Sequence, residues 1–327
     1  MPTLLSRPVP DADSDQTRAS LEALGFQVNS CLPDPLRRGY CTIVFSDPHA
    51  ALAAAAPGPG APAVAADTAQ DFKAKALSLS SASVETIAAR LELDLPALWA
   101  VLKVETSGCG FLPDRRPKIL FERHWFHRLT HGRFDLQAPD VSQPTAGGYG
   151  ASGARQYDRL EQAMRLDRDA ALQSASWGLG QIMGFNAAVA GYANAQELAQ
   201  ACALSEDRQL AAVAAFIAHQ NLGRFLKVRD WTAFAKVYNG PAFRDYDSRL
   251  NEAHRDFLAT GTPDLDIRRI QLALMLVGLD PKNPIDGQFG QRTRNSLQQF
   301  QQRVAIPASG ERDAATLSRL WSEAGWT

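Results

Sequence analysis

Apolar residues recur at helical spacing through most of the chain after residue 69, and one apolar stripe ends in a carboxylate. Residues 95–102 follow the i, i+3, i+4, i+7 pattern of a helix that packs into a core. Glu105 lies three residues after Leu102 on the same stripe, and a Gly-rich run at 106–110 then ends the helix. The pattern therefore predicts a helix that directs a carboxylate toward its buried side.

A carboxylate in that setting could act as a catalytic acid. Desolvation disfavours the charged form and raises the pKa, which a general acid needs if it is to hold a proton near neutral pH. The sequence of this stretch alone also allows a structural reading, in which Glu105 is a helix-end residue that faces water through a gap in the packing.

Composition divides the chain into four parts. Residues 1–50 are expected to form a small N-terminal α/β module of unknown role, and the Ala/Pro/Gly stretch 51–68 is expected to be a semi-rigid linker. Residues 69–260 are expected to form a helical domain, and residues 264–327 a compact three-helix module. The expected fold class is therefore mainly α.

The periodicity also predicts individual elements. In the first module we expect strands at 3–5, 27–30 and 40–45 and a helix at 15–24. In the large domain we expect a strand at 118–121, a long polar loop at 135–154 and helices at 84–91, 95–106, 122–130, 157–174, 195–226, 231–237 and 247–258. In the C-terminal module we expect helices at 267–277, 291–304 and 314–321, with a weak repeat in which Gly287, Thr293 and Leu297 match Gly310, Thr316 and Leu320.

The stretch 174–184 is unusual because it has three glycines in seven residues. Glycine costs helix stability, so backbone must come close to something there, and the floor of a groove fits. Gln181 could then hydrogen-bond a ligand, while Trp177 could stack on a sugar face. The alternative is a tight turn between two helices that buries Ile182 and Met183.

Two further signals are weaker by themselves. Tyr238 and Asn239 precede a Gly-Pro pair, which is ordinary loop chemistry. Glu122 follows an apolar run and could be a partly buried second carboxylate, as most glycoside hydrolases require. A salt bridge from Glu122 to an arginine is the structural alternative.

Three histidines raise the question of a metal. His124, His127 and His131 are spaced to share one helical face, which makes a zinc peptidase site conceivable. The segment lacks the HExxH pattern, however, and Gly132 ends the helix directly after His131. We therefore expect no metal and no cofactor.

Charge and hydropathy exclude other classes. The net charge is −1, which argues against a nucleic-acid partner, and no run of eighteen apolar residues predicts a membrane span. The four cysteines lack CxxC spacing, and free thiols are expected, although a bridge between Cys31 and Cys41 is possible. The N-terminus does not look like a secretory signal, so we expect synthesis in the cytoplasm and export by another route.

Taken together, these stretches resemble the lysozyme-like superfamily and, more closely, the N-acetylmuramidase domain of phage endolysins. In relatives of this kind a helix ends in Glu-Ser, and a Gly-Leu-Met-Gln turn and a Tyr-Asn pair follow. The counterparts here are Glu105 in VETSGCGF, residues 178–181 in SASWGLGQIMGFN, and Tyr238-Asn239. Gly180 departs from the family pattern, which has Met, and no unambiguous second carboxylate matches across the superfamily.

The resemblance covers about residues 75–258 and implies a glycosidase that acts on peptidoglycan glycan strands. It implies Glu105 as the catalytic acid, and Gln181, Tyr238 and Asn239 as residues that line the sugar groove. Glu122 is the candidate for the second carboxylate. Hydrolysis and lytic transglycosylation both remain open, as does a non-catalytic wall-binding protein with the same fold.

Residues 264–325 resemble the peptidoglycan-binding domain 1 family through Gln271, the loop 286–290, Thr293 and the pair Phe300-Gln301. This resemblance implies that the wall-binding residues include Asp286, Phe289 and Thr293. A wall-binding module of this kind raises the local concentration of the catalytic groove at the wall. We therefore expect a monomer that degrades the cell wall after release through a holin or a dedicated secretion machine.

Overall fold

The computed structural model describes residues 4–10, 15, 18, 27–33, 40–46, 72–106, 108–240, 243–279 and 284–327. The chain divides into two compact units, Met1–Ala61 and Pro62–Thr327. The linker predicted at 51–68 lies outside the described residues.

The first unit contains a three-stranded antiparallel sheet in the order β1-β3-β2. Its strands are β1 (Leu4–Pro10), β2 (Gln27–Pro33) and β3 (Tyr40–Ser46), all longer than the apolar runs that predicted them. The prolines of β1 and β2 fit this order, because both are edge strands and edge positions tolerate a missing N–H. Of the helix predicted at 15–24, the structure describes residues 15 and 18, both helical.

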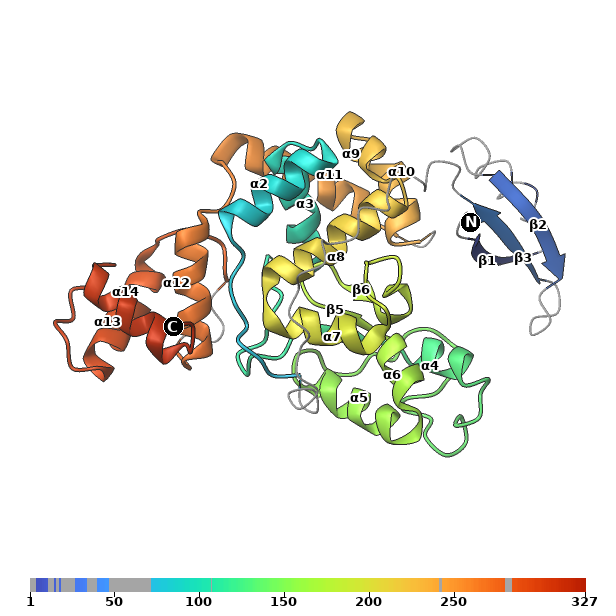
Figure 1. Cartoon of the computed structure of the whole chain (residues 1–327), viewed down its shortest axis with the longest axis horizontal. Helices are drawn as coiled ribbons and strands as arrows, with labels where there is room; N and C mark the ends of the chain where they lie inside the picture. Colours follow the sequence, from blue (N-terminus) through green and yellow to red (C-terminus); the bar gives the residue numbers. More distant parts are fainter. Residues whose placement is uncertain are drawn as a thin grey trace. The chain divides into compact units, whose positions relative to one another are not determined.

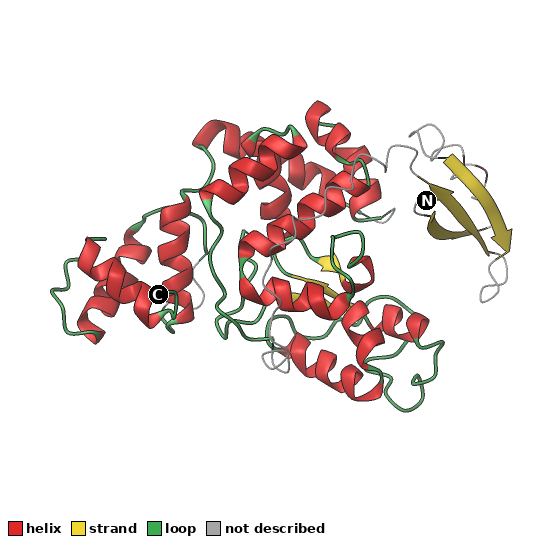
Figure 2. Ribbon diagram, in the orientation of Figure 1, coloured by secondary structure: helices red, strands yellow, loops and turns green. Residues whose placement is uncertain are grey.

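The second unit is predominantly helical (Figures 1 and 2). Its larger part contains α2 (Ser81–Leu91), α3 (Leu95–Thr106), α4 (Arg123–Leu129), α5 (Arg155–Leu166), α6 (Arg168–Gln173), α7 (Ala195–Leu204), α8 (Glu206–His219), α9 (Gly223–Val228), α10 (Trp231–Tyr238) and α11 (Tyr246–Thr260). The 3-10 turn η4 (Gly184–Asn186) follows a second small sheet made of β4 (Ile119–Phe121), β5 (Ala175–Trp177) and β6 (Ile182–Met183).

Two of the long predicted helices are interrupted by caps. Asp167 separates α5 from α6, and Ser205 separates α7 from α8. Both residues have extended backbone and accept a hydrogen bond from the N–H three residues later, so each begins a new helix. Because the helical periodicity continues through the cap, the sequence pattern does not reveal such a break.

Helix α3 lies at the centre of the large domain. It packs against α11 and α2, and Trp99 meets the Phe257 ring of α11 at 6.4 Å between centroids. Ala100 and Val101 are also fully buried, although both lie off the predicted stripe. The helix is therefore enclosed on more sides than the periodicity indicates, and it brings Glu105 out of the core.

The C-terminal part consists of α12 (Leu265–Leu276), α13 (Gln291–Arg303) and α14 (Ala314–Glu323), around a core that includes Leu297, Phe300 and Leu320. Among the described residues, no helix is both long and apolar enough to cross a membrane.

Buried glutamines explain the predicted repeat in this part. Gln271 accepts a hydrogen bond from the Gly287 N–H at 2.9 Å and donates to Thr293 Oγ1 at 3.2 Å. Gln301 repeats the arrangement, accepting from the Gly310 N–H and donating to the hydroxyl of Thr316. Each glutamine holds one loop against one helix, which is the physical basis of the Gly-x5-Thr spacing.

Candidate functional site

Glu105 occupies the last turn of α3, where the helix leaves the core. Burial raises its pKa to about 7, outweighing a hydrogen bond from Tyr246 and the charge of Arg249, which both lower the pKa. The residue nevertheless keeps part of its surface exposed. The structure thus has the desolvated carboxyl that the sequence predicted, at a point which solvent reaches.

Tyr246 is the partner of Glu105 that the sequence did not reveal. Its hydroxyl donates to Glu105 Oε1, and its ring is buried at the start of α11. The ring stacks on that of Tyr238, with centroids 6.5 Å apart. An aromatic residue eight positions after Tyr238 was the one available signal, and it gave no indication of which side chain it would contact.

The backbone that follows Glu105 is held from several sides. Thr106 Oγ1 donates to the Leu179 carbonyl at 3.0 Å, and Lys118 Nζ donates to the Thr106 carbonyl at 3.0 Å. The end of α3 is thereby joined to the glycine turn and to the residue that precedes β4.

The glycine turn packs against α8 at two of its glycines. A Cβ on Gly178 would lie 2.7 Å from Gln209, and one on Gly180 would lie 2.0 Å from Val213 Cγ2. The close approach that the glycines predicted is therefore to another helix. It also accounts for the departure at Gly180, because Val213 occupies the space that a side chain would need.

Gln181 is anchored within the protein. Its Nε2 donates to the Gly178 carbonyl at 2.8 Å and the Lys118 carbonyl at 3.2 Å, and its Oε1 accepts from Ser176 Oγ. The residue has a left-handed backbone conformation and remains partly exposed. Its direct contact with a sugar stays a prediction, and its observed role is to fix the turn beside Thr106.

Trp177 corrects the sequence interpretation. The residue is 1% exposed, its Nε1 donates to the Leu172 carbonyl, and its ring lies 5.2 Å from that of Phe72. Because β5 turns this side chain into the core, the indole is not available to stack on a sugar. Ile182, by contrast, is buried as the turn alternative expected, and Met183 is partly buried.

Tyr238 and Asn239 end α10 close to the same turn. The Tyr238 hydroxyl donates to the Gly180 carbonyl at 2.9 Å, and its ring stacks on Phe234. Asn239 is exposed. The structure thus brings Tyr238 to the glycine turn and, through Tyr246, to Glu105, while a sugar contact by Asn239 stays a prediction.

Glu122 lies between β4 and α4 and is half-buried, with 19% of its side chain exposed. Burial raises its pKa to about 7. The sequence left open a salt bridge to an arginine, and the observed contact is with His124 Nδ1, at 3.4 Å from the carboxylate. Glu122 is therefore a second desolvated carboxyl.

Tyr149, in the long loop after α4, is influenced by the charge of Glu122. Burial raises the pKa of the Tyr149 phenol, the Glu122 carboxylate raises it further, and the Arg244 guanidinium lowers it. Arg244 lies two residues before Tyr246. The charges of Glu122 and Arg244 thus act on the Tyr149 phenol in opposite directions.

The histidines do not share one helical face. Helix α4 ends at Leu129, and His131 has a left-handed backbone that turns the chain away. His127 Nδ1 contacts Asp135, with the nearer oxygen at 2.7 Å. Within the described ranges, no three His, Cys, Asp or Glu side chains are grouped so that they could hold a metal ion.

The three predicted wall-binding residues differ in accessibility. Thr293 is 2% exposed and contacts Gln271, so it supports the loop from inside and does not reach a ligand. Asp286 is exposed, although its Oδ1 accepts from Gln271 Nε2 at 2.8 Å. Phe289 is partly exposed and has the guanidinium of Arg294 5.2 Å from its ring centre. Wall contact by Asp286 and Phe289 stays a prediction.

Replacement of Gly180 by alanine tests the packing of the turn. The new Cβ would clash with the fully buried Val213, so we expect Gly180→Ala to lower the free energy of unfolding by about 1–3 kcal/mol. Thermal and denaturant unfolding measure this. Gly290→Ala is the matched control, because a Cβ there meets nothing within 4 Å. Equal unfolding free energies for the two variants would contradict the steric explanation.

Comparisons with known proteins identify both helical parts of the second unit. The family model for N-acetylmuramidase matches residues 94–258, and the model for a putative peptidoglycan binding domain matches residues 263–320. The crystal structure of the Burkholderia AP3 phage endolysin is 35% identical, with a TM-score of 0.51, over 56% of this chain and 73% of that one. A comparison with curated protein sequences gave no match.

The first family model spans the helix that ends in Glu105, the glycine turn and the Tyr-Asn pair. The second spans the two loops that the buried glutamines hold. The chain therefore belongs to the N-acetylmuramidase family and is a peptidoglycan-degrading glycoside hydrolase of the endolysin type, with a peptidoglycan-binding domain at residues 263–320.

Proposed function

We propose that Glu105 is the general acid in cleavage of the β-1,4 bond between N-acetylmuramic acid and N-acetylglucosamine. The observation that carries this proposal is the state of the Glu105 carboxyl itself. Burial raises its pKa to about 7, although the residue lies at a partly exposed helix end. Such a group holds a proton at neutral pH and can still deliver it to a bound substrate.

The surroundings of Glu105 suit the change of charge during the reaction. Tyr246 donates to Oε1, which orients the carboxyl and leaves Oε2 to carry the proton. Glu105 protonates the leaving glycosidic oxygen as the oxocarbenium-like transition state develops. The resulting carboxylate is then stabilised by the Tyr246 hydroxyl and the positive charge of Arg249.

Glu122 is proposed as the second carboxyl, acting as a general base toward water. A base with a pKa of about 7 is half ionised at neutral pH and is strong enough to take a proton from an attacking water. Its partial exposure supports this role, because water can reach the carboxyl. These observations favour hydrolysis over attack by the substrate's own 6-hydroxyl, which needs no such water.

Mass spectrometry of the products tests the reaction directly. Purified peptidoglycan is digested with the full chain, and the released muropeptides are analysed with and without borohydride reduction. We expect reducing ends at N-acetylmuramic acid, which gain two hydrogens on reduction. Anhydromuramic ends would instead establish transglycosylation, and intact glycan with cut peptides would refute both readings.

We also propose that Asp286 and Phe289 contact the wall, that the enzyme acts as a monomer, and that it reaches the wall through a holin or a dedicated secretion machine. The exposure of Asp286 and the partial exposure of Phe289 support the first of these. Cosedimentation of an Asp286→Ala variant with purified peptidoglycan tests wall contact, and sedimentation velocity tests the oligomeric state.

A further inference from the structure

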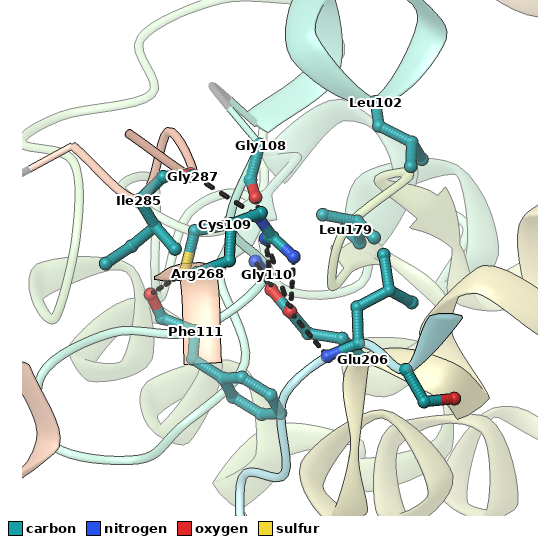
Figure 3. A network of polar contacts seen from close by, with 12 residues as sticks. Leu102, Gly108, Cys109, Gly110, Phe111, Leu179, Glu206, Arg268, Ile285 and Gly287 are labelled. Atoms are coloured by element: carbon teal, nitrogen blue, oxygen red, sulfur yellow. Dashed lines mark hydrogen bonds and ion pairs between the residues drawn. The ribbon is translucent and has the colours of Figure 1, made fainter. Parts of the chain in front are cut away.

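The segment that follows Glu105 is bound by a buried ion pair between two domains (Figure 3). Arg268 belongs to α12 of the peptidoglycan-binding domain, and Glu206 is the first residue of α8 in the muramidase domain. Both side chains are fully buried, and Arg268 Nη1 lies 3.3 Å from Glu206 Oε2. A fully buried arginine donated by an accessory domain is unexpected if that domain is simply tethered.

Arg268 also directly contacts the segment 108–111, which follows Glu105. Its Nη2 donates to the Gly108 carbonyl, three residues after Glu105, and its guanidinium lies 5.2 Å from the centre of the Trp99 ring in α3. Gly108 has a left-handed backbone, and Figure 3 shows its carbonyl oxygen directed at Arg268. One side chain of the binding domain thus reaches both the helix that carries Glu105 and the turn that ends it.

Glu206 holds the same segment from the other side. Its Oε1 accepts from the Gly110 N–H at 2.9 Å, and its Oε2 accepts from the Leu79 N–H at 3.1 Å. With Arg268 in place, the buried carboxylate is fully hydrogen-bonded. Without Arg268, its charge would remain buried with backbone donors alone, so the segment 108–111 would have to rearrange or admit water.

Apolar packing joins the two domains around this ion pair. Cys109 and Phe111 from the segment 108–111 share one buried cluster with Leu272, Met275 and Ile285 of the binding domain. At the end of the chain, Trp326 Nε1 donates to the Lys75 carbonyl at 2.9 Å. The contact is therefore a continuous core, which a flexibly tethered domain does not form.

We infer that the peptidoglycan-binding domain is a structural part of the catalytic unit, and that Arg268 is a positioning residue which holds the segment 108–111 behind Glu105. The sequence alone predicts an anchor that raises local concentration. In the structure it completes the hydrogen bonding of the turn that fixes the general acid. This inference rests on the proposed role of Glu105 for its effect on catalysis.

A substrate that gains nothing from anchoring separates the two roles. We would measure kcat and KM of the full chain on short, uncrosslinked glycan oligomers, which stay in solution. Arg268→Met is expected to lower kcat at least tenfold with KM changed less than twofold, because the acid is misplaced while the sugar groove remains. A domain that only anchors would leave both constants unchanged.

Arg269→Met is the matched control. Arg269 is the next residue of α12, is exposed, and lies over Trp321 within the same domain, 4.3 Å from the ring centre. We expect this variant to keep the wild-type kcat on the oligomers. A tenfold loss in Arg269→Met would show that any damage to α12 lowers activity, and it would overturn the specific role of Arg268.

Two further variants cover the case in which Arg268→Met does not fold. Arg268→Lys keeps the charge but loses the forked contact with Gly108 and Glu206, so we expect kcat between those of wild type and Arg268→Met. Glu206→Gln added to Arg268→Met removes the stranded charge and is expected to restore folding but not kcat. Wild-type kcat in Arg268→Lys and in this double variant would overturn the inference.

Hydrogen exchange gives a readout that does not depend on activity. The amides of Gly110 and Leu79 donate to Glu206, and we expect their exchange to accelerate at least tenfold in Arg268→Lys but not in Arg269→Met. Unchanged exchange would overturn the inference. If exchange accelerates but Glu105→Gln keeps full activity, the proposed function fails and the docking of the domain stands.

Discussion

Glu105→Gln is expected to lower the rate of peptidoglycan cleavage by about 10²–10⁴-fold, because glutamine is nearly isosteric but cannot donate the proton that the leaving oxygen needs. Wild-type activity should fall as pH rises through about 7, where the acid loses its proton. Release of soluble fragments from purified peptidoglycan, followed between pH 5 and 9, measures both effects.

Glu85→Gln is the control for loss of a negative charge, since Glu85 is an exposed residue of α2. It should match the wild-type rate and pH profile. Clearance of peptidoglycan by Glu105→Gln at the wild-type rate would remove Glu105 as the acid.

The Glu105→Gln variant should be more stable than the wild type at alkaline pH. Folding raises the pKa of Glu105 from 4.5 to about 7, so the folded state binds a proton more tightly than the unfolded state. The stability linked to this proton is fully present below pH 4.5 and is lost as pH rises through 7. Glutamine has no proton to lose, so Glu105→Gln should exceed the wild type by about 1–3 kcal/mol at pH 8 relative to pH 5.

Glu122→Gln is expected to lower hydrolysis by about 10²–10⁴-fold, because the attacking water then lacks its base. In the wild type, activity should also decline as pH falls below about 7, where Glu122 becomes protonated. With Glu105 acting on the alkaline side, the pH–rate profile should be bell-shaped with its maximum close to pH 7.

Analysis of the products of Glu122→Gln shows whether Glu122 acts on the attacking water. If Glu122 positions water, residual products of Glu122→Gln should shift toward anhydromuramic ends, since the 6-hydroxyl of the substrate can still attack. Glu85→Gln again serves as the control. An undiminished rate with reducing ends in Glu122→Gln would assign the base to another residue.

Much of the architecture follows from local sequence patterns. The helical class, the strand at 119–121, the long polar loop and the three C-terminal helices all arise from periodicity and turn residues that act over a few positions. Breaks at Asp167 and Ser205 were not predicted, because a cap acts through one side chain within a continuous helical pattern. The N-terminal strands were predicted too short because prolines mark strand ends less strictly on an edge.

Some residues of the candidate site were predicted and others were not, because sequence patterns report only on interactions between neighbouring positions. Glu105 could be identified because its position on an apolar stripe already implies desolvation. Trp177 was misplaced because β5 is the central strand of its sheet and all three of its residues are buried, which depends on pairing with β4 and β6 and cannot be read from three residues. Tyr246 was missed because its contact with Glu105 joins residues 141 positions apart.

The sequence by itself therefore determined where helices form and which carboxyl ends the central one, since both depend on the spacing of neighbouring residues. Only the tertiary structure decided what contacts that carboxyl and the two turns beside it. Tyr246 comes from α11, Val213 from α8, and Arg268 from the peptidoglycan-binding domain. These contacts depend on how helices distant in sequence pack together. Burial raises the pKa of Glu105, while Val213 packs against the glycine turn and Arg268 holds the carbonyl of Gly108.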